Sequence, residues 1–128
     1  MHLVLFARSL RGNSETQEFA SRVFTSLGLT QFEERESSNY PPEERYFIGY
    51  AANASVKVCR SDDGEFPQYP FWVVLEDARN RVLAMETIPL ETAHFAETVA
   101  NAGIQLFQPT EGWGTVGWTP SGTVYGGA

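Results

Sequence analysis

The clearest hydrophobic pattern in the chain predicts a helix between Ser14 and Gly28. Apolar residues recur at the spacing of one helix face, at Phe19, Ala20, Val23, Phe24 and Leu27. Ser14 is a favourable N-cap, and Gln17 completes a capping box with it. Gly28 follows the last apolar position, where helices commonly end in a left-handed residue. We expect this helix to pack against the rest of the domain through its apolar face.

Alternating or continuous apolar residues predict strands before and after this helix. Residues 3–7 are branched or aromatic and form the first predicted strand. Residues 31–37 predict a short strand whose glutamates place it at a sheet edge or on a solvated face. Residues 45–50 and 54–60 lie on either side of a turn and predict a hairpin. Residues 71–75 are apolar at every position, so we expect a central strand covered on both faces.

The second half of the chain predicts further strands and a second helix. Residues 77–80 are expected to form a hairpin loop that leads into a return strand at 81–86. Pro89 is expected just inside a helix that spans roughly residues 90–102. Another short strand is predicted at 104–107.

The C-terminal tail is rich in glycine and predicts a final hairpin. A Pro-Ser-Gly turn at 120–122 lies between Val116 and Val124. The spacing Gly-x-Gly-x-x-Gly at 112–117 matches a dinucleotide-binding fingerprint, which requires a helix directly after it. No helix is predicted there, so we interpret the match as a coincidence and expect no cofactor.

The order of these elements predicts one α+β domain over residues 1–128. We expect an antiparallel or mixed sheet of about five to seven strands with two helices mainly on one face. The chain length of 128 residues is that of a single ordinary domain. Trp72 and Val74 would point to the face opposite the helices. The Trp-rich tail, a long loop or a partner is expected to cover them.

The charge of the chain narrows the choice of partner. Sixteen acidic residues oppose nine basic ones, which gives a formal net charge of −7. Such a protein repels phosphates, so we expect no direct binding to nucleic acid or to an anionic membrane. The same charge would speed the capture of a basic partner, or would serve only solubility. No apolar run approaches the ~20 residues of a membrane span, and Arg8 comes too early for a signal peptide.

Reactive side chains are few and form no catalytic pattern. Cys59 is the single cysteine and lies in a predicted strand, so we expect a buried, inert thiol in a reducing, cytoplasmic location. His2 and His94 are not spaced as a base for this thiol or as a metal pair. His94 is expected at the border of the second helix's apolar face or outside it. We therefore expect no catalytic residue and no enzyme.

Two acidic clusters are the strongest candidates for a site. One flanks Arg35, and the other forms a turn around Gly64 that lacks the full spacing of a calcium loop. We expect no metal there. The clusters are either solvated turns or an acidic surface that recognises a basic protein, with carboxylates for steering and tyrosines for anchoring. The residues expected to contact the partner are Glu33, Glu34, Glu36, Tyr40, Asp62, Asp63, Glu65 and Tyr69.

A segment in the middle of the chain resembles part of a group of short bacterial proteins. Residues 34–40, Glu-Arg-Glu-Ser-Ser-Asn-Tyr, and then Arg-Tyr-Phe at 45–47 resemble a block in short bacterial proteins of unassigned activity, some of which occur with polymorphic toxins. In size, acidity and α+β composition the chain is similar to immunity proteins of contact-dependent growth inhibition systems. That resemblance implies a cytoplasmic protein that binds and neutralises a toxin domain, often a nuclease. It transfers no catalytic or contact residue.

Three hypotheses of function follow. The first is a toxin-neutralising immunity protein whose acidic face occludes the active site of a basic toxin domain. The second is a small-molecule-binding or enzymatic domain with a pocket near Cys59 and His94, beneath the tail that carries Trp113 and Trp118. The third is an adaptor subunit or a homo-oligomer that uses the apolar face behind Trp72.

Overall fold

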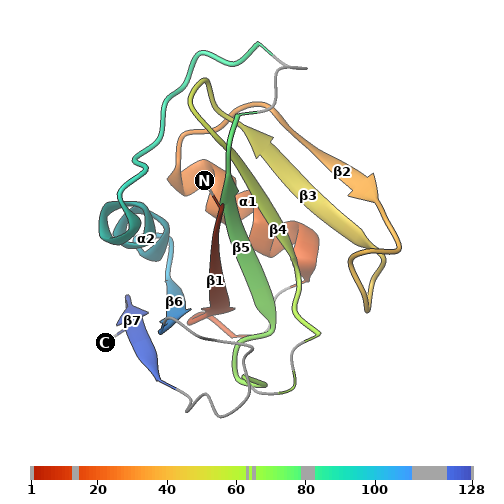
Figure 1. Ribbon diagram of the computed structural model, residues 1–128, viewed down its shortest axis with the longest axis vertical. Coiled ribbons are helices and arrows are strands. Elements are labelled where there is room, and N and C mark those ends of the chain that lie inside the picture. The colour runs from red at the N-terminus through yellow and green to blue at the C-terminus, as the bar shows by residue number, and fades with distance from the viewer. Residues whose placement is uncertain are drawn as a thin grey trace.

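The fold of the protein consists of seven strands and two helices. The computed structural model describes residues 2–12, 15–62, 64, 66–78, 83–110 and 121–127. The helices are α1 (Thr16–Ser26) and α2 (Thr92–Ala100). The strands are β1 (His2–Ser9), β2 (Phe32–Glu36), β3 (Arg45–Tyr50), β4 (Ser55–Arg60), β5 (Phe71–Glu76), β6 (Ile104–Pro109) and β7 (Gly122–Tyr125) (Figure 1).

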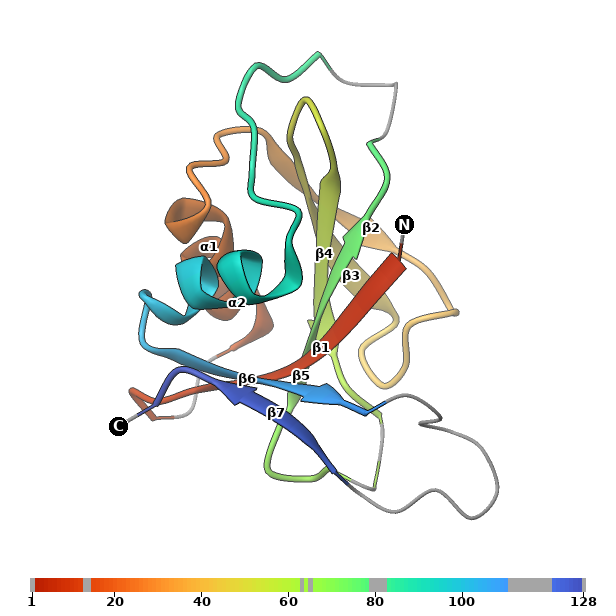
Figure 2. The ribbon, with the colours of Figure 1, turned by 60° about the vertical axis from the view of Figure 1, so that its left-hand side comes forward.

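All seven strands form one sheet in the order β2-β3-β4-β5-β1-β6-β7. Every neighbouring pair is antiparallel. Both helices lie on the same side of this sheet (Figure 2). Helix α1 contacts β3 and β4, whereas α2 contacts β6 and β7. The predicted α+β arrangement is confirmed, and so are the central place of β5 and the edge position of β2.

Helix α1 ends as its sequence predicts. Gly28 has a φ of 73°, which glycine adopts without steric cost. Its N–H donates to Thr25 at 3.0 Å, and the N–H of Leu29 donates to Phe24 at 2.9 Å. These two bonds satisfy carbonyls that the helix end would otherwise leave unpaired.

The predicted capping box at the start of α1 is wrong. The N-cap is Glu15, which has extended backbone angles and makes no side-chain capping bond. Ser14 lies outside the described residues. The first helical residue, Thr16, instead donates its hydroxyl to Glu43 at 2.6 Å. A contact from a distant loop therefore fixes the helix start.

The main core lies between the helices and the sheet. The apolar face of α1 is fully buried there, and Phe19 stacks on Phe71 of β5 with ring centroids 4.1 Å apart. Gly49 of β3 lies directly under Phe24, so that a Cβ atom at this glycine would come within 2.7 Å of the ring. The absence of a side chain at Gly49 lets α1 approach the sheet closely.

A second, smaller cluster covers part of the opposite face. Phe66 and Tyr69 come from the connection between β4 and β5 and are buried against Phe6, with Trp72 and Phe107 packed beside them. A long loop was one of the three covers expected for Trp72. The connection supplies that cover on this part of the face.

The prediction of a return strand at 81–86 is wrong. Both edges of β5 are already paired, one with β4 and the other with β1, so no edge is left for another strand. Residues 83–91 form neither a helix nor a strand. The backbone of Ile88 instead makes two hydrogen bonds with the Asn53 side chain, at 2.8 and 3.1 Å.

Two further predicted boundaries differ from the structure. Pro89 lies outside the second helix, whose N-cap is Glu91 and whose first residue is Thr92. The final hairpin pairs β7 with β6, and Gly122 belongs to the strand rather than to a turn. Residues 111–120, which include Val116 and the glycine fingerprint, lie outside the described part of the chain.

Candidate partner-binding surface

The edge strand β2 carries the first acidic cluster. Among the described strands it pairs only with β3. Side chains alternate across the sheet. Glu33 and Arg35 therefore lie on the same face as Tyr50, whereas Glu34 and Glu36 lie on the face of α1. The structure thus divides the three predicted glutamates between two faces.

A polar groove lies beside Glu34 and Glu36 where β2 connects to β3. Its volume is about 550 Å³, and its lining residues are Glu34, Glu36, Ser37, Ser38, Glu43, Glu44 and Arg45. We call it the acidic groove. Arg45 lies 3.3 Å from Glu34 and 3.7 Å from Glu43. Two of the four carboxylates that line the groove therefore contact its one guanidinium, and the groove keeps a negative balance.

The β2–β3 connection brings Glu43 and Glu44 into this groove. The backbone N–H of Ser37 donates to the backbone carbonyl of Glu44 at 2.9 Å, and the N–H of Glu44 donates to the backbone carbonyl of Tyr40 at 2.8 Å. The sequence analysis did not include Glu43 and Glu44 among the candidate contact residues. Their position could have been predicted from the hairpin, because antiparallel pairing places the residues just after a turn beside the residues just before it.

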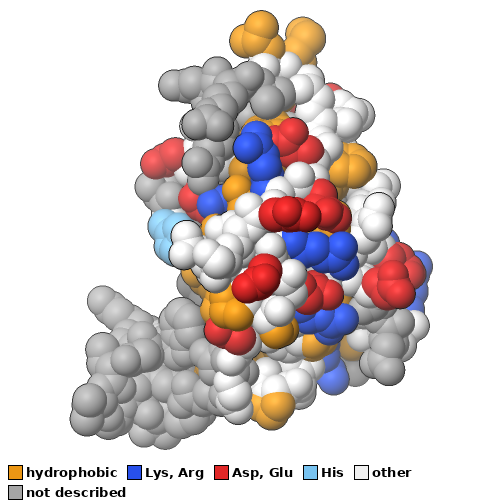
Figure 3. Space-filling view, turned by 90° about the vertical axis from the view of Figure 1, so that its right-hand side faces the viewer, with side chains coloured by type: hydrophobic (Ala, Val, Ile, Leu, Met, Phe, Trp, Pro, Cys, Tyr) orange, Lys and Arg blue, Asp and Glu red, His pale blue; other side chains and the backbone are white. Residues whose placement is uncertain are grey.

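Glu33 does not line the acidic groove, and its carboxylate is hydrogen-bonded to two neighbouring side chains. It accepts hydrogen bonds from the Tyr50 hydroxyl and from Nε of Arg35, both at 2.6 Å. The Tyr50 hydrogen bond first, and then that of Arg35, lower the pKa of Glu33. On the side of the molecule where β2 and β3 lie, acidic and basic side chains are interleaved (Figure 3). A partner would have to compete with these bonds for Glu33.

Tyr40 belongs to a cluster around Lys57, the only lysine in the chain. The Tyr40 ring packs on Tyr46 at 4.4 Å, and Lys57 Nζ donates to the Tyr40 hydroxyl at 3.0 Å and lies 3.1 Å from Glu76. Burial lowers the pKa of Lys57, but the hydrogen bonds to Tyr40 and Glu76 outweigh it and leave the pKa raised. Tyr40 is therefore half-buried over an internal ion pair.

The second acidic cluster is only partly described. Asp62 follows β4, at the same end of the sheet as the acidic groove because β3 and β4 are antiparallel. Asp63 and Glu65 lie outside the described residues. Tyr69 is only 6% exposed, its hydroxyl lies 3.3 Å from Gln105, and its ring stacks on Phe107. The expectation that Tyr69 is a surface anchor is wrong, because the ring completes the smaller core cluster.

The structure does not bring Cys59 and His94 together, as the alternative site would require. Cys59 is fully buried, and it points away from the helices because its neighbour Val58 lies in the helix-side core. His94 is exposed on α2, on the other side of the sheet. Burial, and then the Asp62 carboxylate, raise the pKa of Cys59 to about 12. Within the described ranges no three His, Cys, Asp or Glu residues are placed to hold a metal ion.

We expect Cys59 to resist thiol reagents in the folded protein. At pH 8 the thiol stays protonated and enclosed, and only a thiolate reacts. A chromogenic disulfide reagent should give less than about a hundredth of the rate seen in denaturant. Reaction of the native protein at the unfolded rate would show that Cys59 is accessible after all.

Comparison of the chain with protein-family models, with curated proteins and with solved structures found no match. Within the described residues, no helix is both long enough and apolar enough to cross a membrane.

Proposed function

We propose that the protein is a non-catalytic binding module that captures a basic protein on the acidic groove. The observation that carries the proposal is the ratio of charges there, four carboxylates to one guanidinium, at an exposed edge of the sheet. An arginine or lysine side chain of the partner would enter the groove and pair with the carboxylates. The negative charge of the whole chain would steer the encounter.

We further propose that this partner is a toxin domain and that the protein acts as its cytoplasmic immunity protein. The resemblance of residues 34–40 and 45–47 supports this class, and half of those residues line the acidic groove: Glu34, Glu36, Ser37, Ser38 and Arg45. A toxin that acts on nucleic acid has a cationic cleft, which an acidic surface complements. Binding would block the cleft by occlusion, across an interface of roughly 1,600 Å² in total.

The direct test is co-purification with the basic C-terminal domain of a toxin encoded beside this gene. We expect a stable one-to-one complex in which the toxin domain has lost its activity. A toxin domain that binds but stays fully active would exclude occlusion. The absence of any complex with such a domain would exclude the immunity class.

Charge reversal in the groove is expected to slow association with that domain. Glu36→Lys with Glu44→Lys replaces two carboxylates of the groove with cations. We expect the association rate to fall at least about tenfold at low salt, with a weaker dependence on ionic strength. Stopped-flow fluorescence measures both quantities.

The matched control is Glu97→Lys with Glu18→Lys, which makes the same change of net charge at exposed helix positions. We expect the control to slow association much less. Equal slowing by the two pairs would mean that net charge alone acts, and that the groove is not the docking site.

A further inference from the structure

The hydrogen bonds between β2 and β3 show which backbone groups of β2 the sheet uses. At one end of the pair, the Tyr50 N–H donates to the Gln31 carbonyl at 2.9 Å. At the other end, the Ser37 N–H donates to the Glu44 carbonyl, also at 2.9 Å. In an antiparallel pair only every second residue of a strand bonds to its neighbour. The odd-numbered residues of β2 therefore bond to β3, and the even-numbered residues do not.

The even-numbered residues of β2 face the open edge of the sheet. They are Phe32, Glu34 and Glu36, and their N–H and carbonyl groups point away from β3 (Figure 1). Within the described part of the chain, no group forms a hydrogen bond to them. The strand contains no proline, so each of these residues keeps its N–H donor. Such an edge is a template for pairing with a further strand.

The side chains along this edge favour a basic strand. On the face away from the helices, Glu33 forms an ion pair with Arg35. On the α1 face, Glu34 and Glu36 lie along the acidic groove, and Glu36 contacts no basic side chain of the described residues. Phe32 lies on that same face and is 47% exposed. The α1 face of the edge thus presents two carboxylates and then an aromatic ring to an incoming strand.

A second copy of this chain fits the edge poorly. Antiparallel pairing centred on Glu34 would place its carboxylate directly opposite the same carboxylate of the other copy, which is destabilising. Each copy also has a formal net charge of −7, so the two would repel one another as they approach. The other edge strand of the sheet, β7, has no charged residue and therefore does not select a basic strand.

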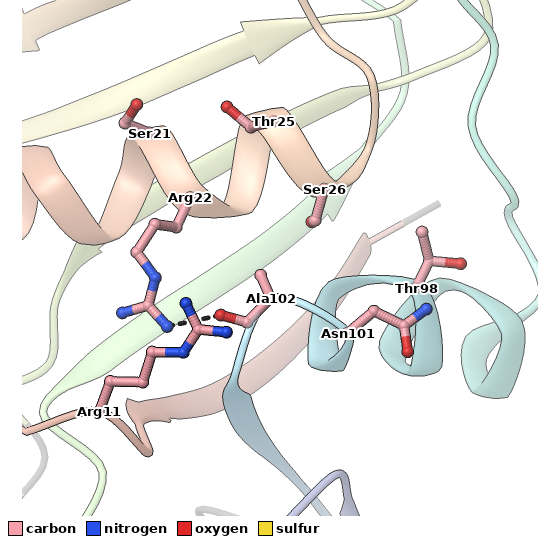
Figure 4. Close-up of a pocket in the computed structure, with 8 residues that line it drawn as sticks. All are labelled: Arg11, Ser21, Arg22, Thr25, Ser26, Thr98, Asn101 and Ala102. Carbon is pink, nitrogen blue, oxygen red and sulfur yellow. Dashed lines mark hydrogen bonds between the residues drawn. The ribbon is translucent and has the colours of Figure 1, made fainter.

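The groove between the helices is not a rival site for a basic segment. It has a volume of about 400 Å³, and both Arg11 and Arg22 extend toward it (Figure 4). Arg22 donates to Ser9 Oγ at 2.7 Å and to the Ala102 carbonyl at 2.6 Å, which holds its guanidinium there. No carboxylate of the described residues lines this groove. Its two guanidinium groups would repel a cationic segment.

We propose that the basic partner docks by adding an antiparallel strand to β2, an inference that rests on the proposed function and specifies its mode of docking. In strand addition, main-chain hydrogen bonds give affinity and alternate side chains give specificity. Opposite Glu36, Glu34 and Phe32, the partner strand would carry two basic residues and then an apolar one at alternate positions. Directly opposite residues have Cβ atoms about 5 Å apart, so a lysine or arginine reaches the facing glutamate.

A peptide with the sequence Thr-Lys-Thr-Lys-Thr-Ile-Thr, blocked at both ends, tests this proposal in an NMR titration of the whole protein. At saturation we expect the amides of Phe32, Glu34 and Glu36 to exchange with solvent at least about tenfold more slowly, because their N–H groups become bonded. The amides of Glu33 and Arg35 are the internal control. They already bond to β3, so their exchange should change less than about twofold.

N-methylation of the peptide separates strand addition from attraction between charges alone. A methyl group on the nitrogen of the second lysine removes the N–H that faces Glu34, so we expect binding to weaken at least about tenfold. The matched control carries the methyl group on the next threonine, whose N–H faces away from β2, and should bind within about threefold of the parent peptide. A peptide with both lysines replaced by glutamate should not bind.

The outcomes separate this inference from the function on which it rests. Equal binding of the two methylated peptides, with chemical-shift changes at Ser37 and Ser38, would overturn strand addition but leave the acidic groove as a docking site for basic groups. Binding of the glutamate peptide as tight as that of the lysine peptide would contradict both proposals. Failure of the lysine peptide to bind at millimolar concentration would overturn strand addition, whereas the charge-reversal variants test the groove independently. A dimer of the free protein with slow exchange at Glu34 would give the edge to a second copy and overturn the proposal.

Discussion

Replacing Phe19 with alanine is expected to lower the free energy of unfolding by about 3–5 kcal/mol. The Phe19 side chain is fully buried and stacks on Phe71, which is itself 1% exposed. Truncation removes the whole ring from the contact between α1 and the central strand. The close packing of α1 on the sheet leaves the neighbours little freedom to fill the cavity. Urea denaturation followed by tryptophan fluorescence measures the loss.

Phe32→Ala is the matched control for that variant. Phe32 makes the same kind of ring contact, with Phe24 at a centroid distance of 5.2 Å, but it is 47% exposed on the edge strand. We expect its loss to cost only about 1 kcal/mol. If Phe32→Ala destabilised the protein as much as Phe19→Ala, the packing of α1 on β5 would not be the main source of stability.

Local sequence patterns predicted the elements whose burial or exposure can be inferred from their own residues. The helical spacing from Phe19 to Leu27 and the glycine after it define α1. The apolar run in β5 predicts a strand covered on both faces, and the glutamates of β2 predict an edge. Each of these signals depends on burial or exposure of the segment itself.

Elements whose environment depends on distant segments were not predictable in this way. Residues 81–86 have the composition of a strand, but a strand needs a free sheet edge, and β1 occupies the edge next to β5. The N-terminal strand is placed there by the fold as a whole. Likewise, the start of α1 depends on Glu43, which no local capping pattern reveals.

The same reasoning explains which site residues were found. Glu34 and Glu36 were visible as a charged edge strand, but only the hairpin register shows that Glu43 and Glu44 complete the acidic groove. Tyr69 was taken for a surface anchor because nothing near it in sequence indicates the Phe107 ring that covers it.

The last large effect concerns the ion pair between Lys57 and Glu76. The Lys57 side chain is only 9% exposed, and its ammonium lies near the Tyr40 and Tyr46 rings as well as near Glu76. Removing one partner of a buried pair leaves an uncompensated charge. We therefore expect Glu76→Gln to cost about 3 kcal/mol of unfolding free energy, because Lys57 stays buried and charged.

Lys57→Met should cost far less, within about 1 kcal/mol, because methionine fills the same space without a charge to desolvate. Adding Lys57→Met to Glu76→Gln should then restore most of the stability that Glu76→Gln removes. Thermal and urea unfolding of the two single variants and the double variant give the coupling energy directly. Strictly additive losses would mean that the two charges do not stabilise one another and that the tyrosine rings alone hold the lysine in place.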